Sequence, residues 1–467
     1  MSRKGDLPVI QLEPRVAAGL PSWDEILDHL SRADRPTVAD VLKEADRRGR
    51  PAVQPRCGVG GHREMVELLR LLEAEAAPDI LSVTVDAHTR LRHYATAART
   101  LRTNPGGLNG YPLVTHGWQH GRALAAAVRV PLEVRHGSPD GRDLFAVSLA
   151  SGILSFEGGG ISYNLPYSKN VPLAVSLQAW REVDLVCGLL AEHGVVVDRE
   201  VFGTLTAVLV PPSISLAVSF LEARMAADAG VVCLSIAYPQ SGEIHQDVAA
   251  LRSIRALARR YLPAGVRVHP VLHQFMGVFP QTRAGAEQLI LFGGLVGRLG
   301  GATKIVNKTS QEALGIPVAS ANAAGIALTR LACTELLDDL RLDEARVAEE
   351  EYWVQREVAE IIEPLLDESD LLKAVDLAFQ QGRLDIPFPA STHAHAAILP
   401  KRDADGAIRY LDPGNLPLTD VTVRRNQQCL RRTVRTRNTG LVDMVTADIN
   451  YFLRLDRPAV TPFGGSS

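Results

Sequence analysis

The 467-residue sequence lacks several patterns that mark particular classes of protein. It has five cysteines, widely spaced and odd in number, and no Cys-x-x-Cys pair, so neither a zinc knuckle nor a disulfide framework is indicated. No run of about 18 uncharged apolar residues occurs, so no membrane-spanning helix is expected. The first residues have no apolar core of the kind found in signal peptides. Together these absences predict a cytoplasmic protein.

A basic excess is also missing. With 53 acidic and 50 basic residues the net charge is −3, so no surplus of positive charge is available to neutralise phosphates. Nucleic acid is therefore not expected as a partner, and the local basic run 424–435 is more typical of a solvated helix face or a subunit contact. A His-Glu-x-x-His motif is absent as well. No metal site is predicted, because no ligand spacing links the histidines His88, His116, His136, His273, His393 and His395.

What the sequence does contain, from residue 51 onward, is a repeated alternation of short β-rich runs with longer helical patterns. In the first helical pattern, apolar residues recur at the spacing i, i+3, i+4, i+7. Strands that alternate with helices predict parallel pairing with right-handed crossovers. The runs that qualify as strands are 52–56, 80–86, 112–116, 132–135, 153–157, 195–202, 231–237, 267–273 and 303–307.

Eight such units make a (β/α)₈ barrel, also called a TIM barrel. One of the candidates is therefore expected to be wrong, and 112–116 is the weakest because it is short and begins with proline. The alternative is an open doubly wound sheet. The sequence does not favour that alternative, since the Gly-x-Gly-x-x-Gly motif that usually marks it does not follow the first strand. An α/β barrel is the predicted fold class.

Three regions follow from this pattern. Residues 1–50 are predicted to form an N-terminal helical extension, in which Ser22-Trp-Asp-Glu25 has the form of a capping box. Residues 51–335 are predicted to form the catalytic barrel. Residues 336–467 are predicted to form a cap or subunit-contact region of helices and loops, with Pro364 as a helix break.

Three arginines, Arg56, Arg90 and Arg135, end or follow short apolar runs. In a parallel barrel the carboxyl ends of the strands face the active site. A guanidinium group can bind a carboxylate through two parallel hydrogen bonds. An ordinary surface salt bridge is the alternative for each of these arginines.

Glu157 ends another run and precedes Gly158-Gly159-Gly160, where glycine allows backbone or ligand to approach closely. Tyr163 and Tyr167 follow. The segment is interpreted either as a ligand-lining loop with one acid and two hydroxyls or as a core loop whose phenols are satisfied internally. Beside three arginines, Glu157 is expected to remain ionised.

Lys308 and Glu312 stand four residues apart after the last strand candidate. This spacing predicts an i,i+4 pair on a helix. The alternative is that the two residues line a ribose or nucleoside pocket.

Several longer strings resemble the large (epsilon) subunits of glutamate mutase, also called methylaspartate mutase, over about residues 52–417. The densest matches are Gln54-Pro-Arg56, Leu108-Asn-Gly-Tyr-Pro112, Val134-Arg-His-Gly137, Glu157-Gly-Gly-Gly-Ile-Ser-Tyr-Asn-Leu-Pro-Tyr167, Val210-Pro-Pro-Ser213, His273-Gln274, Gly301-Ala-Thr-Lys304 and Asp385-Ile-Pro-Phe388. The resemblance implies a TIM barrel and an adenosylcobalamin-dependent isomerase. Its reaction would be the reversible radical rearrangement of the L-glutamate carbon skeleton to (2S,3S)-3-methylaspartate.

The resemblance also implies roles for individual residues. Arg56, Arg90 and Arg135 would hold the substrate carboxylates, and Glu157 would meet the substrate amine as the catalytic acid–base group. Further substrate contacts would come from His136, Tyr163 and Tyr167. The residues implied around the cofactor, chiefly around its adenosyl group, are Gly58, Asn109, Pro166, Phe202, Phe279, Lys308, Glu312 and Ile316.

One motif of this cobalamin class, Asp-x-His-x-x-Gly, is missing. Asp86-Ala87-His88 begins like it, but Leu91 stands where glycine is needed. The resemblance therefore implies that the lower-ligand histidine comes from a separate small (sigma) cobalamin-binding subunit, in a heterotetramer built on a homodimer of this chain. Two alternatives remain at this point: a cobalamin-independent barrel lyase that uses Glu157 as base on an acidic amino acid, and a non-catalytic partner of the small subunit.

Overall fold

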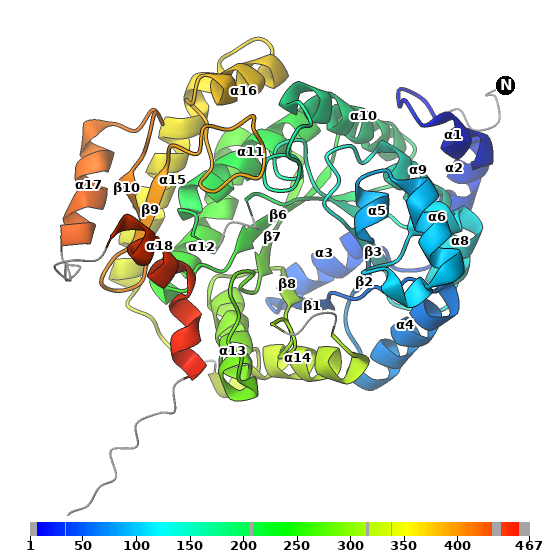
Figure 1. Ribbon diagram of the computed structural model, residues 1–467, viewed down its shortest axis with the longest axis horizontal. Helices are drawn as coiled ribbons and strands as arrows, with labels where there is room; N and C mark the ends of the chain where they lie inside the picture. The colour runs from blue at the N-terminus through cyan, green and yellow to red at the C-terminus, as the bar shows by residue number, and fades with distance from the viewer. Residues whose placement is uncertain are drawn as a thin grey trace, which may run out of the picture.

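The computed structural model describes residues 7–32, 34–204, 209–313, 317–337, 339–431 and 440–456. Its centre is a nearly closed barrel of eight parallel strands, hydrogen-bonded in the order β1-β8-β7-β6-β5-β4-β3-β2 (Figure 1). The strands are β1 (Ala52–Pro55), β2 (Leu81–Thr84), β3 (Leu132–Arg135), β4 (Ser155–Glu157), β5 (Asp198–Val201), β6 (Cys233–Pro239), β7 (Arg267–His273) and β8 (Lys304–Asn307). The predicted (β/α)₈ barrel is confirmed, and the open sheet is excluded.

Eight of the nine strand candidates are strands of this barrel. The ninth, 112–116, is wrong, as its weak signal suggested: Leu113–His116 is the short helix α7, with Pro112 at its N-cap. Proline has no N–H to donate to a strand ladder, whereas the first positions of a helix do not need that donor.

The barrel closes between β1 and β2 through isolated bonds in place of a regular ladder. The Thr84 amide donates to the Cys57 carbonyl at 2.9 Å. Pro55 cannot donate, and the Ser82 hydroxyl bridges the seam by donating to the Pro55 carbonyl at 2.8 Å. A Cβ added at Gly58 would lie 2.3 Å from the Thr84 carbonyl oxygen, so close backbone approach at this seam requires glycine.

Helices surround the barrel (Figure 1). In α4 (His62–Ala76), Met65, Leu69 and Leu72 of the predicted apolar stripe are buried. Four short helices connect β2 to β3: α5 (Ala87–Arg90), α6 (Tyr94–Thr103), α7 and α8 (Trp118–Ala126). The other barrel helices are α4 (His62–Ala76), α9 (Arg142–Ala150), α10 (Leu173–Glu192), α11 (Pro212–Asp228), α12 (Ile244–Tyr261), α13 (Arg283–Leu299) and α14 (Ala319–Leu331).

The N-terminal segment forms three helices, α1 (Pro14–Gly19), α2 (Trp23–Ser31) and α3 (Val38–Arg48). The predicted capping box is present, because Ser22 and Glu25 exchange side-chain and backbone hydrogen bonds at the start of α2. Helix α3 lies behind the strands in Figure 1 and packs Val38 and Leu42 against Ala52 and Ile80 near the starts of β1 and β2. It thus covers the barrel end opposite the carboxyl ends of the strands.

The C-terminal segment contains more regular structure than predicted. Pro364 does not break the helix α15 (Glu344–Leu366), which continues to its end two residues later. The helix α16 (Leu371–Gln380) follows, and a hairpin of β9 (Leu399–Arg402) and β10 (Ile408–Asp412) lies in a region predicted as loops. Two more helices complete it, α17 (Asp420–Arg431) and α18 (Leu441–Ile449). These elements lie on one side of the barrel, beside α11 and α12 (Figure 1).

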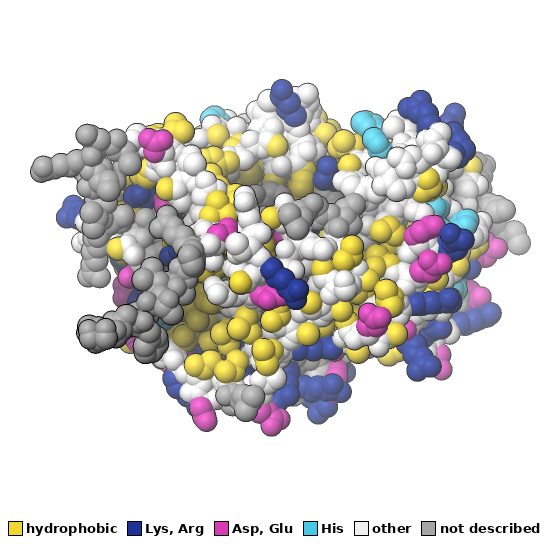
Figure 2. Space-filling view, turned by 60° about the horizontal axis from the view of Figure 1, so that its bottom comes forward, with side chains coloured by type: hydrophobic (Ala, Val, Ile, Leu, Met, Phe, Trp, Pro, Cys, Tyr) yellow, Lys and Arg dark blue, Asp and Glu magenta, His cyan; other side chains and the backbone are white. Residues whose placement is uncertain are grey.

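In the described part of the chain, no helix combines the length and the apolar character needed to span a bilayer. Figure 2 shows hydrophobic side chains over much of the middle of one face, with Lys and Arg side chains gathered mainly along its lower and right parts.

Candidate active site

The predicted charged residues gather at the carboxyl end of the barrel. Arg135 and Glu157 are the last residues of β3 and β4, Arg56 follows β1, and Arg90 ends α5, the short helix after β2. The backbone amide of His136 donates to Glu157 Oε1 at 2.9 Å, and Arg135 forms an ion pair with Glu157 Oε2. The strand order brings these residues from separate parts of the chain to one end of the barrel.

Arg135 is the centre of a buried ion network. Its side chain is 1% exposed and pairs with Glu133 at 2.7 Å and Glu200 at 3.1 Å, in addition to Glu157. Lys304 pairs with the same two partners, Glu133 at 2.5 Å and Glu200 at 2.6 Å. Two cations thus lie among three carboxylates, so the network has one acid more than it has bases.

Most residues of this buried network come from alternate strands of the barrel and form one layer of its interior. Gln54 comes from β1, Glu133 and Arg135 from β3, Glu200 from β5 and His273 from β7. Residues of a barrel layer come from every second strand because neighbouring strands are staggered. Four residues of this network, Glu133, Glu200, His273 and Lys304, were not among the predicted site residues. The available signal was the presence of charged residues inside short strand runs, since a buried charge needs a partner.

Burial and the neighbouring charges shift the pKa values of the three carboxylates. Burial raises the pKa of Glu157 to about 7, against the opposing charge of Arg135. Burial likewise raises the pKa of Glu133, although Lys304 opposes this. Burial also disfavours the charged form of Glu200, yet Lys304 and Arg135 hold its pKa well below the usual range. Desolvation thus opposes the expected ionised form of Glu157, while the guanidinium of Arg135 favours it.

Aromatic rings surround Glu157. The Tyr163 ring lies edge-on to His136, with centroids 4.9 Å apart, and edge-on to Tyr167 at 5.5 Å. Phe202 contacts Tyr163 at 4.9 Å and His273 at 5.2 Å. Burial lowers the pKa of His136 well below its usual value, so this ring is neutral. The predicted residues of the 157–167 segment are thus brought together around the carboxylate.

Arg56 and Arg90 differ from Arg135 because they are half-buried. Among the described residues, neither guanidinium forms an ion pair with a carboxylate, and Arg90 Nε has no hydrogen-bond partner. The Arg90 side chain lies over the Tyr167 ring, 5.6 Å from its centroid. Burial raises the pKa of Tyr167 to about 12, while the charges of Arg56, Arg90 and Arg135 oppose this shift. All three arginines therefore act electrostatically on one phenol.

Lys308 and Glu312 form an ion pair at 2.7 Å, but not on a helix, because residues 310–313 form a turn after β8. The predicted contact between Lys308 and Glu312 is therefore confirmed, but the prediction that they lie on a helix is wrong. Lys308 is buried, which lowers its pKa despite Glu312. Arg56 lowers the pKa of both residues, so this pair lies within reach of the arginine group.

The other predicted residues have varied surroundings. Asn109 accepts a hydrogen bond from the Ala87 amide at 2.9 Å and so holds the first turn of α5, which carries Arg90. Pro166 is half-buried beside Tyr167 in the same turn. Phe279 packs in a separate apolar cluster with Phe275 and Phe452. Ile316 lies outside the described residues.

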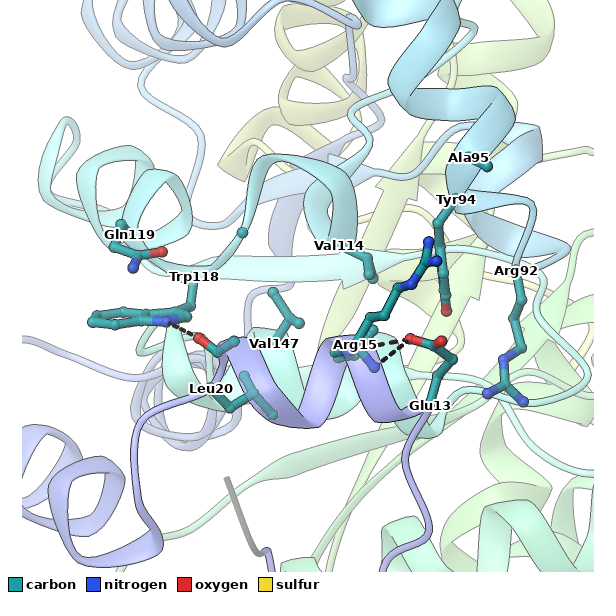
Figure 3. A pocket seen from close by; sticks show the side chains of 13 residues that line it. Glu13, Arg15, Leu20, Arg92, Tyr94, Ala95, Val114, Trp118, Gln119 and Val147 are labelled. Carbon is teal, nitrogen blue, oxygen red and sulfur yellow. Dashed lines mark hydrogen bonds between the residues drawn. The ribbon is translucent and has the colours of Figure 1, made fainter. Parts of the chain in front are cut away.

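Two other features of the described structure resemble sites. Within the described residues, one group has the spacing of a metal site, Glu157 with Glu200 and His273, but the Arg135 guanidinium already contacts all three. A cavity of about 570 Å³ lies between α1 and the helices α6 to α9, with Trp118 and Arg15 at its wall (Figure 3). It contains none of the predicted site residues.

The sequence matches one family profile over residues 34–452, described as methylaspartate mutase E chain (MutE). The glutamate mutase epsilon subunit of Haloarcula marismortui is 40% identical over 403 residues, which cover 85% of this chain and 82% of that protein. The subunit of Halobacterium salinarum is 39% identical over 431 residues, covering 91% and 90%. That of Desulfitobacterium hafniense is 42% identical over 389 residues, covering 81% and 80%. The resemblance read from the site motifs is confirmed, and the chain belongs to the methylaspartate mutase E chain family.

Proposed function

We propose that this chain is the catalytic barrel subunit of a mutase that interconverts L-glutamate and (2S,3S)-3-methylaspartate. The observation that carries the proposal is the pair of half-buried arginines, Arg56 and Arg90, without carboxylate partners in the described structure, beside the buried Arg135–Glu157 ion pair. Glutamate has two carboxylates and one ammonium. Ligand charges that leave water require partners of opposite sign, because an unpaired buried ion costs several kcal/mol.

Substrate binding then divides among these groups. Arg56 and Arg90 offer free guanidinium groups to carboxylates. Arg135 and Glu157 form an internal pair whose two charges match an α-carboxylate and an α-ammonium, so a bound amino acid replaces one ion pair by two. Glu157, with its pKa raised to about 7, can accept a proton or a hydrogen bond from the amine. Tyr163 and Tyr167 shield this exchange from water.

The residues on the β8 side fit an adenosyl group. Lys308 and Glu312 place an ammonium and a carboxylate together, which suits the two hydroxyls of a ribose. Phe202 supplies an aromatic surface beside Tyr163. When bound, adenosylcobalamin supplies homolysis of its cobalt–carbon bond, while this chain binds, orients and shields the substrate. The remaining residues proposed for this group are Gly58, Asn109, Pro166, Phe279 and Ile316.

The lower-ligand histidine is assigned to a separate small cobalamin-binding subunit in a heterotetramer. Asp86 in this chain has another task, because its carboxylate accepts from the His88 and Thr89 amides at 2.9 and 3.1 Å and caps α5. The purified chain alone is expected to show no turnover of glutamate with adenosylcobalamin. Turnover should appear when the small subunit is added.

This assay also separates the alternatives. Full turnover by the chain alone would contradict the two-component proposal. Ammonia release from glutamate or methylaspartate without cobalamin would favour the lyase, for which Glu157 would serve as base. A complex with the small subunit that binds neither substrate nor cofactor would indicate the non-catalytic partner.

Replacing Arg90 by lysine tests whether its guanidinium binds a substrate carboxylate. Lysine keeps the charge but cannot donate two parallel hydrogen bonds to one carboxylate. We expect the free energy of transition-state stabilisation, calculated from kcat/KM, to fall by about 2–4 kcal/mol. The loss should appear mainly as a raised KM. Arg92→Lys is the control, because Arg92 lies two residues away and pairs with Asp140 and Asp143 outside the site. Kinetics of Arg90→Lys within about twofold of the unmodified enzyme would show that Arg90 does not bind substrate.

A further inference from the structure

The turn that carries Tyr163 and Tyr167 has an anchor outside the predicted site. Within residues 159–168 the backbone bonds follow a helical pattern, beginning with the Tyr163 amide to the Gly159 carbonyl at 3.1 Å. The first amides of such a turn have no partner within it. Two of them, at Ile161 and Ser162, donate to Glu222 Oε1 at 2.7 and 2.8 Å.

Glu222 comes from α11, which begins about fifty residues later in the sequence. The residue is 4% exposed, and burial raises its pKa to about 7 against the hydrogen bonds from the Ser162 and Ile161 amides. A carboxylate at the start of a helical turn both accepts the free amides and complements their partial positive charge. Here that capping group is supplied from another helix and not from the chain segment itself.

Gly159, the middle residue of the triple glycine, leaves room for this contact. A Cβ added at Gly159 would lie 2.2 Å from the Glu222 carboxyl carbon. Gly159 has no left-handed backbone angle, so it is this contact that excludes a side chain there. At Gly160 the obstacle is the backbone of Leu177 at 2.8 Å, and at Gly158 glycine is favoured by a backbone φ of +116° and by the ring of Tyr163 at 2.5 Å. Neighbouring protein groups and the backbone angle of Gly158 therefore account for these glycines.

Arg199 binds the backbone on both sides of Glu157, before the turn that Glu222 caps. Its guanidinium donates to the Phe156 carbonyl at 2.6 Å and to the Gly158 carbonyl at 3.0 Å, on either side of Glu157. It is oriented by Asp184 at 2.7 Å and by the Trp180 ring, whose centroid is 4.8 Å away. One buried cation therefore fixes the carbonyls around Glu157, and one buried carboxylate fixes the amides that begin the tyrosine turn.

From this geometry we propose that Glu222 is a positioning residue for substrate binding, acting with Arg199 through the Glu157–Tyr167 segment. This inference rests on the proposed function. A carboxylate and two phenols that must meet one small zwitterion need fixed positions, since an error of about 1 Å can cost about 10²-fold in rate. Glu222 does this without touching the substrate.

The test compares three variants of the full chain. Glu222→Leu removes the acceptor, Glu222→Gln keeps a neutral acceptor of the same shape, and Gly159→Ala displaces the carboxylate. Hydrogen exchange of the peptide 158–168 is measured on the chain alone, and KM and kcat are measured with the small subunit. We expect Glu222→Leu and Gly159→Ala to lose protection of this peptide and to raise KM by at least about tenfold, and Glu222→Gln to rescue both.

Asp247→Leu is the matched control. Asp247 is also a buried carboxylate that binds two backbone amides, at Ser241 and Gly242, but in the loop after β6. It should lower stability without exposing the 158–168 peptide or changing KM. Unchanged exchange in Glu222→Leu and Gly159→Ala would overturn the proposal, as would faster exchange with an unchanged KM. If the unmodified complex shows no mutase activity, the proposed function fails, and the exchange data alone decide whether Glu222 holds the turn.

Discussion

Replacing Arg135 by methionine is expected to lower the free energy of unfolding by about 3–5 kcal/mol. The guanidinium is 1% exposed and pairs with Glu133, Glu157 and Glu200. Methionine fills much of the same volume but leaves Lys304 as the one cation of the network, so buried carboxylates lose their partner. Removing one member of a buried ion network costs more than the net value of the pair, because the remaining charge stays desolvated. Urea denaturation of the purified chain measures the change.

Arg90→Met is the matched control, because it removes the same group from a half-buried site without an ion pair in the described structure. Its expected cost is at most about 1 kcal/mol. A loss of less than about 1 kcal/mol for Arg135→Met as well would show that the network does not stabilise the barrel. Arg135 would then be a substrate ligand only.

Replacing Glu157 by glutamine is expected to reduce turnover of the reconstituted enzyme by roughly 10²-fold, typical of a positioned acid–base group. Glutamine keeps one acceptor oxygen, which can serve the His136 amide, while its NH2 group takes the place of the oxygen that contacts Arg135. The loss of this contact and the removal of a buried charge oppose each other, so the stability at pH 7 should change by no more than about 1 kcal/mol. Near-normal turnover, or a loss of stability large enough to explain the lost activity, would assign Glu157 a structural role.

The pH dependence gives a second measurement. The folded-state pKa of Glu157, about 7, lies above the ordinary value of 4.5, so the folded protein holds this proton more tightly than the unfolded chain. The associated stability is fully present below pH 4.5 and is lost as the pH rises through about 7. The free energy of unfolding of the unmodified chain, minus that of Glu157→Gln, should therefore fall between about pH 5 and pH 8. A difference that is flat or rises with pH would contradict the raised pKa.

The local features of the site were accessible from the sequence. Glu133 and Arg135 alternate along one short run, and the period of two along a strand places both on the same side. Arg56, Arg90 and Glu157 follow or end other apolar runs, and a parallel barrel brings such ends to one face. These inferences need only the strand period and the direction of the crossovers.

Ion-pair partners that lie on distant strands could not be inferred from such local patterns. Glu200 pairs with Arg135, and Lys304 pairs with Glu200, only after the barrel closes. The raised pKa of Glu157 follows first from its burial in the closed barrel and then from the nearby Glu200 and Glu133, which a list of nearby arginines does not reveal. The hairpin of β9 and β10 was missed because Leu399-Pro-Lys-Arg402 contains a proline and two charges, which weaken a strand signal.

By itself the sequence determined the alternation of strands and helices, hence the eight-stranded barrel, its family and the end at which the arginines and Glu157 gather. The tertiary structure alone decided which charges pair, which acid is driven toward protonation, and that Glu222 caps the turn of Tyr163 and Tyr167 across a gap that glycine leaves open. The physical reason is the separation along the chain of the groups on which each effect depends. Periodicity and turn chemistry act between neighbours along the chain, whereas desolvation and ion pairing depend on every group that the closed barrel brings within a few ångströms.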